Sequence, residues 1–157
     1  SPRRGETFVT QKIVQAMCKI KLKKQKTLYL GNLYSKRDWG HARDFVNAMW
    51  LIMQLKKPND FVIATGKQTT VKNFVNIVAS RLGIKIKWKG VGIKERALDE
   101  NGNVIVACDK AYYRPLEVKN LLGDARKARK ILKWSPKTNI NDLISEMLEI
   151  EMNKLTS

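Results

Sequence analysis

A short, uninterrupted apolar run, Phe61–Ala64, constrains the fold of this chain more than any other segment. It follows the helix-breaking sequence Pro58-Asn59-Asp60 and ends at Thr65-Gly66. A run of this length between turn residues is typical of a strand that is buried on both faces, as the strands of parallel sheets are. The pattern therefore predicts a buried strand over residues 61–64 and a fold of the α/β class.

Five other segments carry apolar residues at helical spacing. Their expected bounds, in chain order, are Thr7 or Thr10 to the lysine run at 23–26, His41 to Leu55, Thr69 or Thr70 to Gly83, Asp124 to Leu132, and Ile140 to Met152. The threonines and Asp124 are expected to cap the helices that they begin. The second helix is expected to bury one side, made of Phe45, Val46, Met49, Trp50 and Met53.

The remaining regular pattern is extended. Leu28–Leu30 predicts a short strand before a turn at Gly31-Asn32, and the alternation over Ile84–Lys89 predicts a strand with one solvated face. A hairpin is expected over Leu98–Val106, because Asn101-Gly102 is a strong turn signal. Few of these segments could pair with the 61–64 strand, so most of a central sheet is missing. This pattern fits a chain cut from a larger α/β protein.

Composition limits the class of protein. The 157 residues are 43% apolar, which is typical of one globular domain. No apolar run approaches the roughly 18–20 residues that span a bilayer, and no secretory leader is present, so we expect a cytoplasmic protein without a membrane partner. The two cysteines, Cys18 and Cys108, are expected to be reduced.

The formal net charge of +17 raises the alternative of a basic nucleic-acid-binding module. The lysines are spread along the chain, however, and no Cys/His finger or aromatic–basic interleaving accompanies them. A lysine-rich composition together with a site for an anionic ligand explains the charge more simply. We therefore expect no nucleic-acid partner.

The usual catalytic motifs are absent from this sequence. It contains no Gly-x-Gly-x-x-Gly, no Walker loop and no Tyr-x-x-x-Lys. Its single histidine, His41, excludes a His-rich metal site and stands at an expected helix start, where either a structural or a catalytic role is open. No residue is therefore assigned to catalysis or to a metal.

Arginines in rigid contexts are the best candidates for ligand binding. Arg37 lies between a strand and a helix, and Arg114 stands three residues before Glu117. A guanidinium is a natural fork for a pyrophosphate, and a carboxylate accepts well from ribose hydroxyls. The alternative is that Arg37–Asp38 and Arg114–Glu117 are internal salt bridges. At the start of the chain, Arg3-Arg4-Gly5 precedes a helix in an arrangement that suits phosphate.

Four segments resemble one enzyme family when they are read in order. They are SPRRGETFVTQKI (1–13), LYLGNLYSKRDWGHARDFVNAMW (28–50), FVIATGKQTTVKNFV (61–75) and YYRPLEVKNLLGDARKARKILKWSPK (112–137). They are similar to the C-terminal part of the GDP-mannose 4,6-dehydratases, which are extended short-chain dehydrogenases/reductases. The Arg-Asp-aromatic-x-His stretch alone indicates only nucleotide-sugar epimerases and dehydratases, so another enzyme of that fold remains the nearest alternative.

The resemblance implies a two-domain, Rossmann-like enzyme with NADP as cofactor. Members of the family convert GDP-mannose to GDP-4-keto-6-deoxymannose and form homo-oligomers, either dimers or tetramers. Their glycine-rich loop and catalytic Ser/Thr, Glu, Tyr and Lys lie upstream of the part that matches this chain. Residues 1–157 would then be the GDP-sugar-binding part, with the NADP-binding Rossmann region absent, and would be inactive alone.

The same resemblance implies roles for six residues. It assigns Arg4 to NADP, and the remaining five to the GDP-sugar. These are Val9, through its backbone near the base, Lys12 as a GDP contact, Arg37 and Arg114 on the pyrophosphate, and Glu117 on the ribose. Arg3 is left as a surface or subunit-contact residue.

Overall fold

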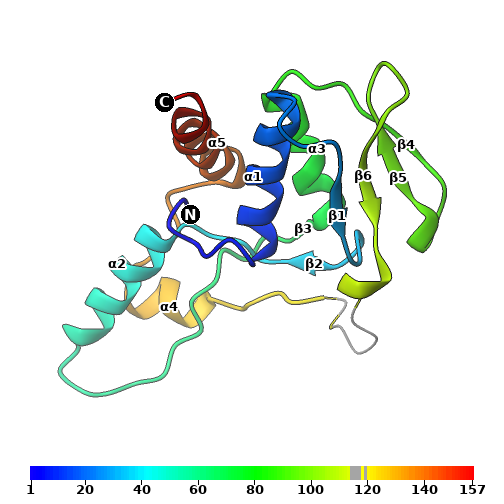
Figure 1. Ribbon diagram of the computed structural model, residues 1–157. Coiled ribbons are helices and arrows are strands. Elements are labelled where there is room, and N and C mark those ends of the chain that lie inside the picture. Colours follow the sequence, from blue (N-terminus) through cyan, green and yellow to red (C-terminus); the bar gives the residue numbers. More distant parts are fainter. Residues whose placement is uncertain (114–117, 119) are drawn as a thin grey trace.

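The structure is a computed structural model that describes residues 1–113, 118 and 120–157. Its main body contains a four-stranded sheet with helices packed on one side (Figure 1). The strands lie in the order β1-β6-β5-β4, with bounds Leu28–Leu30 (β1), Val104–Cys108 (β6), Arg96–Leu98 (β5) and Lys87–Lys89 (β4). β1 runs parallel to β6, and the other two pairs are antiparallel.

Three helices build the core of the main body. They are α1 (Val9–Lys21), α3 (Val71–Arg81) and α5 (Ile140–Thr156). Their facing sides bury Ile13, Phe74 and Ile144 completely, and Val106 of β6 joins the same cluster. This packing joins the first and last helices of the chain, so the main body is one hydrophobic unit.

A small second sheet connects the main body to the candidate site. β2 (Lys36–Arg37) pairs antiparallel with β3 (Thr69–Thr70), with Arg37 opposite Thr69. Thr70 then caps α3 by accepting a hydrogen bond from the amide of Asn73, as predicted. The sequence did not predict β2 or β3, because two-residue strands carry no periodic signal.

A second hydrophobic cluster lies beside the main body, below and to the left in Figure 1. It is built from α2 (Ala42–Met53), α4 (Arg126–Ile131) and the chain near Ala64. Its buried residues are small, apart from Leu132 and Trp134. The indole of Trp134 donates a hydrogen bond to the main-chain carbonyl of Asp44, which ties the end of α4 to α2.

The predicted strand over residues 61–64 is wrong. Among the described residues no strand is assigned there, and the side chain of Val62 is 55% exposed, so the run is not buried on both faces. Ala64 is buried against Gly123, where a Cβ atom would collide with it. No strand among the described residues pairs with the apolar run, so the run is not part of a sheet.

The predicted burial of α2 is also wrong for four of its five residues. Phe45 is half-buried in the second cluster, whereas the other four are 59–81% exposed: Val46, Met49, Trp50 and Met53. The helix buries Asp44 and Ala48 instead. The apolar stripe of α2 was correctly located, but no described segment covers it. We call these four residues the α2 apolar face.

Local predictions agree better with the structure. The hairpin between β5 and β6 turns where expected, and Asp99 accepts hydrogen bonds from the amides of Asn101 and Asn103. Gly102 has φ +81°, a conformation that favours glycine. In contrast, neither Thr7 nor Thr10 caps α1: the N-cap residue is Phe8, which has no side-chain acceptor.

Other expectations have mixed outcomes. Only residues 87–89 of the predicted 84–89 strand are paired, and α5 continues to Thr156 rather than ending at Met152. Cys18 and Cys108 are both free thiols, as expected. Within the described residues, no helix is long and apolar enough to cross a bilayer.

We predict that Trp50→Lys leaves the stability of this chain almost unchanged. The indole of Trp50 is 59% exposed, and exposed substitutions usually change the free energy of unfolding by less than about 0.5 kcal/mol. Self-association should decrease, because an exposed apolar patch becomes charged. Urea denaturation and sedimentation velocity measure the two effects. A loss of stability above about 2 kcal/mol would show that α2 is packed differently.

Candidate ligand-binding site

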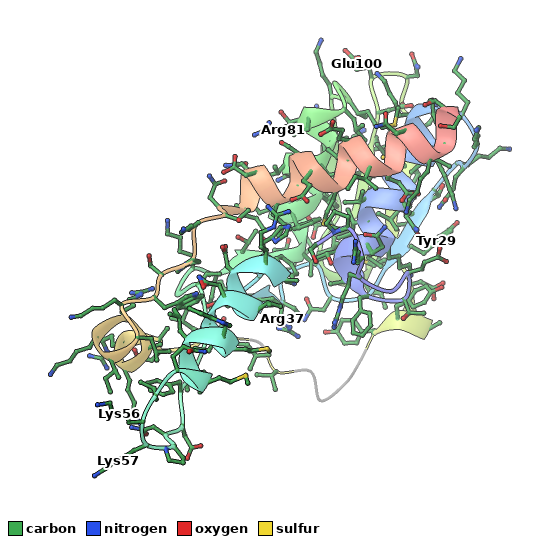
Figure 2. The ribbon with its side chains drawn as sticks, turned by 90° about the vertical axis from the view of Figure 1, so that its left-hand side faces the viewer. Tyr29, Arg37, Lys56, Lys57, Arg81 and Glu100 are labelled. Carbon is green, nitrogen blue, oxygen red and sulfur yellow. The ribbon has the colours of Figure 1, made fainter. Side chains whose placement is uncertain are left out.

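Strand β2 holds Arg37 at the junction of the two hydrophobic clusters (Figure 2). Its guanidinium nitrogen Nη1 donates to the carbonyl oxygens of Lys36 and Val118, each at 2.8 Å. A parallel bridge between Lys36 and Asn120 holds the same stretch of chain beside β2. Arg114 and Glu117, the other predicted pyrophosphate and ribose contacts, lie outside the described residues.

Asp38 does not serve as the salt-bridge partner of Arg37 that the sequence left open. The ion pairs between described residues do not join these two side chains. Both carboxylate oxygens of Asp38 instead accept hydrogen bonds from the turn at Thr65 and Gly66. The negative charge next to Arg37 in sequence is therefore directed at another part of the chain.

Two of the predicted GDP contacts, Val9 and Lys12, lie in the first turn of α1. The Nζ of Lys12 stands 3.3 Å from the centroid of the Tyr112 ring, a cation–π contact. Lys12 and Tyr112 line a pocket of about 230 Å³, and Gln15 and Tyr29 line it too. The pocket thus combines a cation, an amide and aromatic rings. Sequence reasoning missed Tyr112, whose only signal was its position just before Arg114.

The chain requires a glycine at position 31, where β1 meets the turn at residues 110–112. A Cβ atom on Gly31, at the end of β1, would collide with the carbonyl oxygen of Tyr112. The close approach holds the 110–112 turn against β1. Gly31 and Tyr113 also line a second pocket, of about 390 Å³, together with Tyr34 and Ile93.

Arg4, the predicted NADP contact, is exposed and stacks on the ring of Phe8 at 3.4 Å. A permanently charged, surface-exposed guanidinium fits a phosphate group. Phe8 has no side-chain acceptor, so its side chain does not cap the first backbone N–H groups of α1, which can donate to a ligand. Arg4 and Lys12 thus both lie near the start of α1, where the helix dipole favours an anion.

A buried carboxylate braces the wall of the second pocket. Glu95 is 3% exposed and accepts a 2.6 Å hydrogen bond from Lys72 of α3. Burial alone would raise the pKa of Glu95, but the bonds from Lys72 and Tyr34 hold that pKa below its usual value. The bond to Glu95 raises the pKa of Lys72, and likewise the pKa of Tyr34. Sequence reasoning did not find this network.

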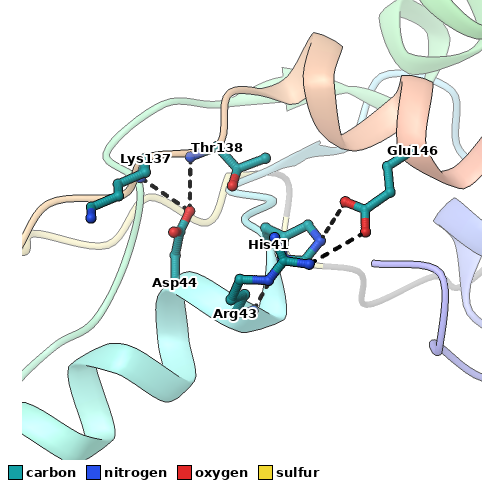
Figure 3. Close-up of polar contacts among 6 residues, drawn as sticks. All are labelled: His41, Arg43, Asp44, Lys137, Thr138 and Glu146. Carbon is teal, nitrogen blue, oxygen red and sulfur yellow. Dashed lines mark hydrogen bonds and ion pairs between the residues drawn. The ribbon is translucent and has the colours of Figure 1, made fainter.

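His41 has a structural role (Figure 3). It is the N-cap residue of α2, and its Nδ1 accepts from the amide of Arg43 at 3.0 Å. Its Nε2 lies 2.8 Å from a carboxylate oxygen of Glu146 of α5. Asp44 accepts from the amides of Lys137 and Thr138. Together these contacts join α2 to the start of α5, and no open face remains for catalysis.

A metal site and a nucleic-acid-binding face would both need clustered side chains. Within residues 1–113, 118 and 120–157, no group of three or more His, Cys, Asp or Glu side chains could hold a metal ion. Of the cations labelled in Figure 2, Lys56 and Lys57 lie together, and Arg37 and Arg81 each lie apart from them.

Comparisons with known proteins agree with the resemblance. The family model described as GDP-mannose 4,6 dehydratase matches residues 1–147. A GDP-mannose 4,6-dehydratase of Sinorhizobium fredii is 49% identical over 156 residues, covering 99% of this chain and 44% of that protein. GDP-mannose 4,6 dehydratase 2 of Caenorhabditis elegans is 49% identical over 148 residues, covering 94% and 39%. The chain thus spans less than half the length of these relatives.

Solved structures show the fold. RMD from Pseudomonas aeruginosa, complexed with NADPH, has a TM-score of 0.79 at 13% identity and covers 98% of this chain and 46% of its own. The dTDP-glucose 4,6-dehydratase from Bacillus anthracis, in complex with NAD, has a TM-score of 0.71 at 17% identity, covering 98% and 42%. The predicted fold, part of a Rossmann-like extended short-chain dehydrogenase/reductase, is confirmed.

Proposed function

This chain belongs to the GDP-mannose 4,6 dehydratase family, and we propose on that basis that it is the GDP-sugar-binding part of such an enzyme. The parent protein would convert GDP-mannose to GDP-4-keto-6-deoxymannose with NADP. When bound, NADP would supply the oxidation of the hexose and the later return of hydride. We propose the reaction for the whole parent enzyme, and the binding of GDP for this chain.

One observation carries the assignment of the binding site. The segment from Tyr112 to Val118 is held at both ends by residues that the resemblance assigns to GDP. Tyr112 contacts Lys12 of α1, and the carbonyl of Val118 accepts from Arg37 of β2. Cations of two separate elements thus contact the described residues on either side of positions 114–117. An anion of two phosphates needs this kind of paired positive charge.

The proposed roles follow from the chemistry of each group. Arg37 binds the pyrophosphate through its planar fork, with Arg114 as a second fork and Glu117 as acceptor for the ribose hydroxyls. Lys12 contacts GDP, and the backbone of Val9 lies near the guanine, for which the 230 Å³ pocket beside Lys12 offers aromatic rings and amide groups. Arg4 contacts the phosphate of NADP. Binding energy from the GDP half would hold the hexose in place during reaction.

Chemistry is assigned to another part of the parent polypeptide. The chain has no Tyr-x-x-x-Lys pair, and its single histidine caps a helix. We assign the α2 apolar face and the side chain of Val62 to contact with that other part, because both present apolar groups that no described segment covers. A homo-oligomer of the parent enzyme is part of the same proposal.

Turnover assays test whether the catalytic groups lie outside this chain. Incubated with GDP-mannose and NADP, this chain alone should form no 4-keto product, since the proposal assigns the base and the proton donor of the reaction to the other part of the parent enzyme. Formation of GDP-4-keto-6-deoxymannose by the isolated chain would contradict the proposal that the catalytic groups lie elsewhere. For the parent enzyme, preference for a UDP- or dTDP-sugar over GDP-mannose would favour another nucleotide-sugar enzyme of this fold.

A further inference from the structure

Both oxygens of the Asp38 carboxylate, just after β2, accept hydrogen bonds. Its Oδ1 accepts from the amide of Thr65 at 3.0 Å and from the Thr65 hydroxyl, and its Oδ2 accepts from the amide of Gly66 at 2.8 Å. Hydrogen bonds to an ionised acceptor are stronger than neutral ones. Three of them on one side chain fix the distance between residue 38 and the 65–66 turn.

That turn is itself held firmly from the opposite side. Arg129 of α4 donates from Nη2 to the carbonyl of Thr65 at 3.0 Å. Gly66 has φ +76°, and a Cβ atom on Gly40 would lie 2.8 Å from Cγ2 of Thr65. The turn is therefore packed closely and has little freedom to move. Asp38 is bonded to a turn that directly follows Ala64 of the second hydrophobic cluster.

Arg37 depends on such a support because its own strand is minimal. β2 consists of two residues; it pairs with the two residues of β3, and Lys36 makes one further bridge to Asn120. The Arg37 guanidinium donates to the carbonyls of Lys36 and Val118, which lie on the N-terminal side of β2 and on the neighbouring segment. On the C-terminal side, the next anchor after Arg37 is the Asp38 carboxylate.

We propose that Asp38 is a positioning residue for Arg37: by binding the Thr65–Gly66 turn, it sets the direction in which the guanidinium meets a diphosphate. The proposal rests on the proposed function, in which Arg37 binds the pyrophosphate of GDP. It assigns a role to the carboxylate next to the arginine that is neither a salt bridge nor a ligand contact. A shift of a ligand-contacting group by about 1 Å can reduce its contribution to ligand binding or catalysis by about 100-fold.

Two variants and their combination test this role. Asp38→Asn keeps the shape but turns one acceptor oxygen into a donor that faces another N–H, and Thr65→Val removes the hydroxyl. Asp38→Asn should raise the Kd for GDP about tenfold, the effect of roughly one charge-assisted hydrogen bond. If Asp38 acts through Thr65, the double variant should lose less than the product of the two single effects. The exposed Asp60→Asn is the matched control.

Binding alone does not separate positioning from loss of fold, so a second readout follows Arg37 directly. The NMR signal of the Arg37 Nε–H should shift in Asp38→Asn and Thr65→Val, without GDP, and stay in place in Asp60→Asn. A lowered melting temperature with unchanged Kd and unchanged Arg37 signal would overturn the proposal in favour of a purely structural role. If wild-type chain binds no GDP, the proposed function fails, and the Arg37 signal still decides whether Asp38 positions it.

Discussion

Replacing Arg37 with alanine should raise the Kd for GDP by about 100-fold, because a bidentate, charged contact to the pyrophosphate is lost. Arg37→Lys should recover only part of the affinity, since an ammonium is a point charge and cannot form the two parallel bonds of a guanidinium. Isothermal titration calorimetry of the chain with GDP measures both effects. Circular dichroism establishes that each variant is folded.

The matched control for Arg37→Ala is Arg81→Ala. Arg81 ends α3 and is exposed, and Figure 2 shows it well apart from Arg37. Both substitutions remove one positive charge from the +17 chain, so a general electrostatic effect would weaken GDP binding equally in both. An equal loss in the two variants would contradict a specific pyrophosphate contact at Arg37.

Lys72→Met should destabilise the chain by about 3 kcal/mol at neutral pH, because it leaves the carboxylate of Glu95 buried without its ammonium partner. The exposed pair Lys85–Glu100 provides the control: its side chains are 82% and 62% exposed, and Lys85→Met should cost at most about 0.5 kcal/mol. Urea denaturation of the three proteins measures the difference. Equal losses in the two variants would show that burial of Glu95 is unimportant.

The pH dependence of this pair has a defined sign. The folded-state pKa of Glu95 is lowered, so its contribution to stability is present above the unfolded value of about 4.3 and is lost as pH falls through the folded pKa. The pKa of Lys72 is raised, so its contribution is lost only as pH rises through a value above about 10.4. The gap between wild type and Lys72→Met should therefore be widest between these limits and narrow in acid.

Features that depend on neighbouring residues in sequence were predicted well. The hairpin turn at Asn101-Gly102 and the Thr70 cap follow from local hydrogen bonds and backbone preference, and both are present. The periodicity of α2 also gave its bounds to within a few residues. Periodicity does not say what covers an apolar stripe, however, so the exposure of Met49 and Trp50 was not predictable from it.

The candidate site was predictable in part, through its residue types and the resemblance. Arg37 was selected because it was expected between a strand and a helix, whereas the structure places it on β2, a strand that the sequence did not predict. The partners of these residues come from distant positions: Tyr112 lies 100 residues from Lys12, and Asp38 meets a turn 27 residues away. Single-sequence patterns contain no information about such contacts, which is why both were missed.

The most direct test of the account is a calorimetric titration of this chain with GDP and, in parallel, with UDP. We expect GDP to bind and UDP to bind at least about tenfold more weakly, because the guanine would occupy the pocket that Lys12 and Tyr112 line. Absence of GDP binding, or equal affinity for UDP, would contradict the claim that these residues form the GDP-binding part of a GDP-mannose 4,6-dehydratase.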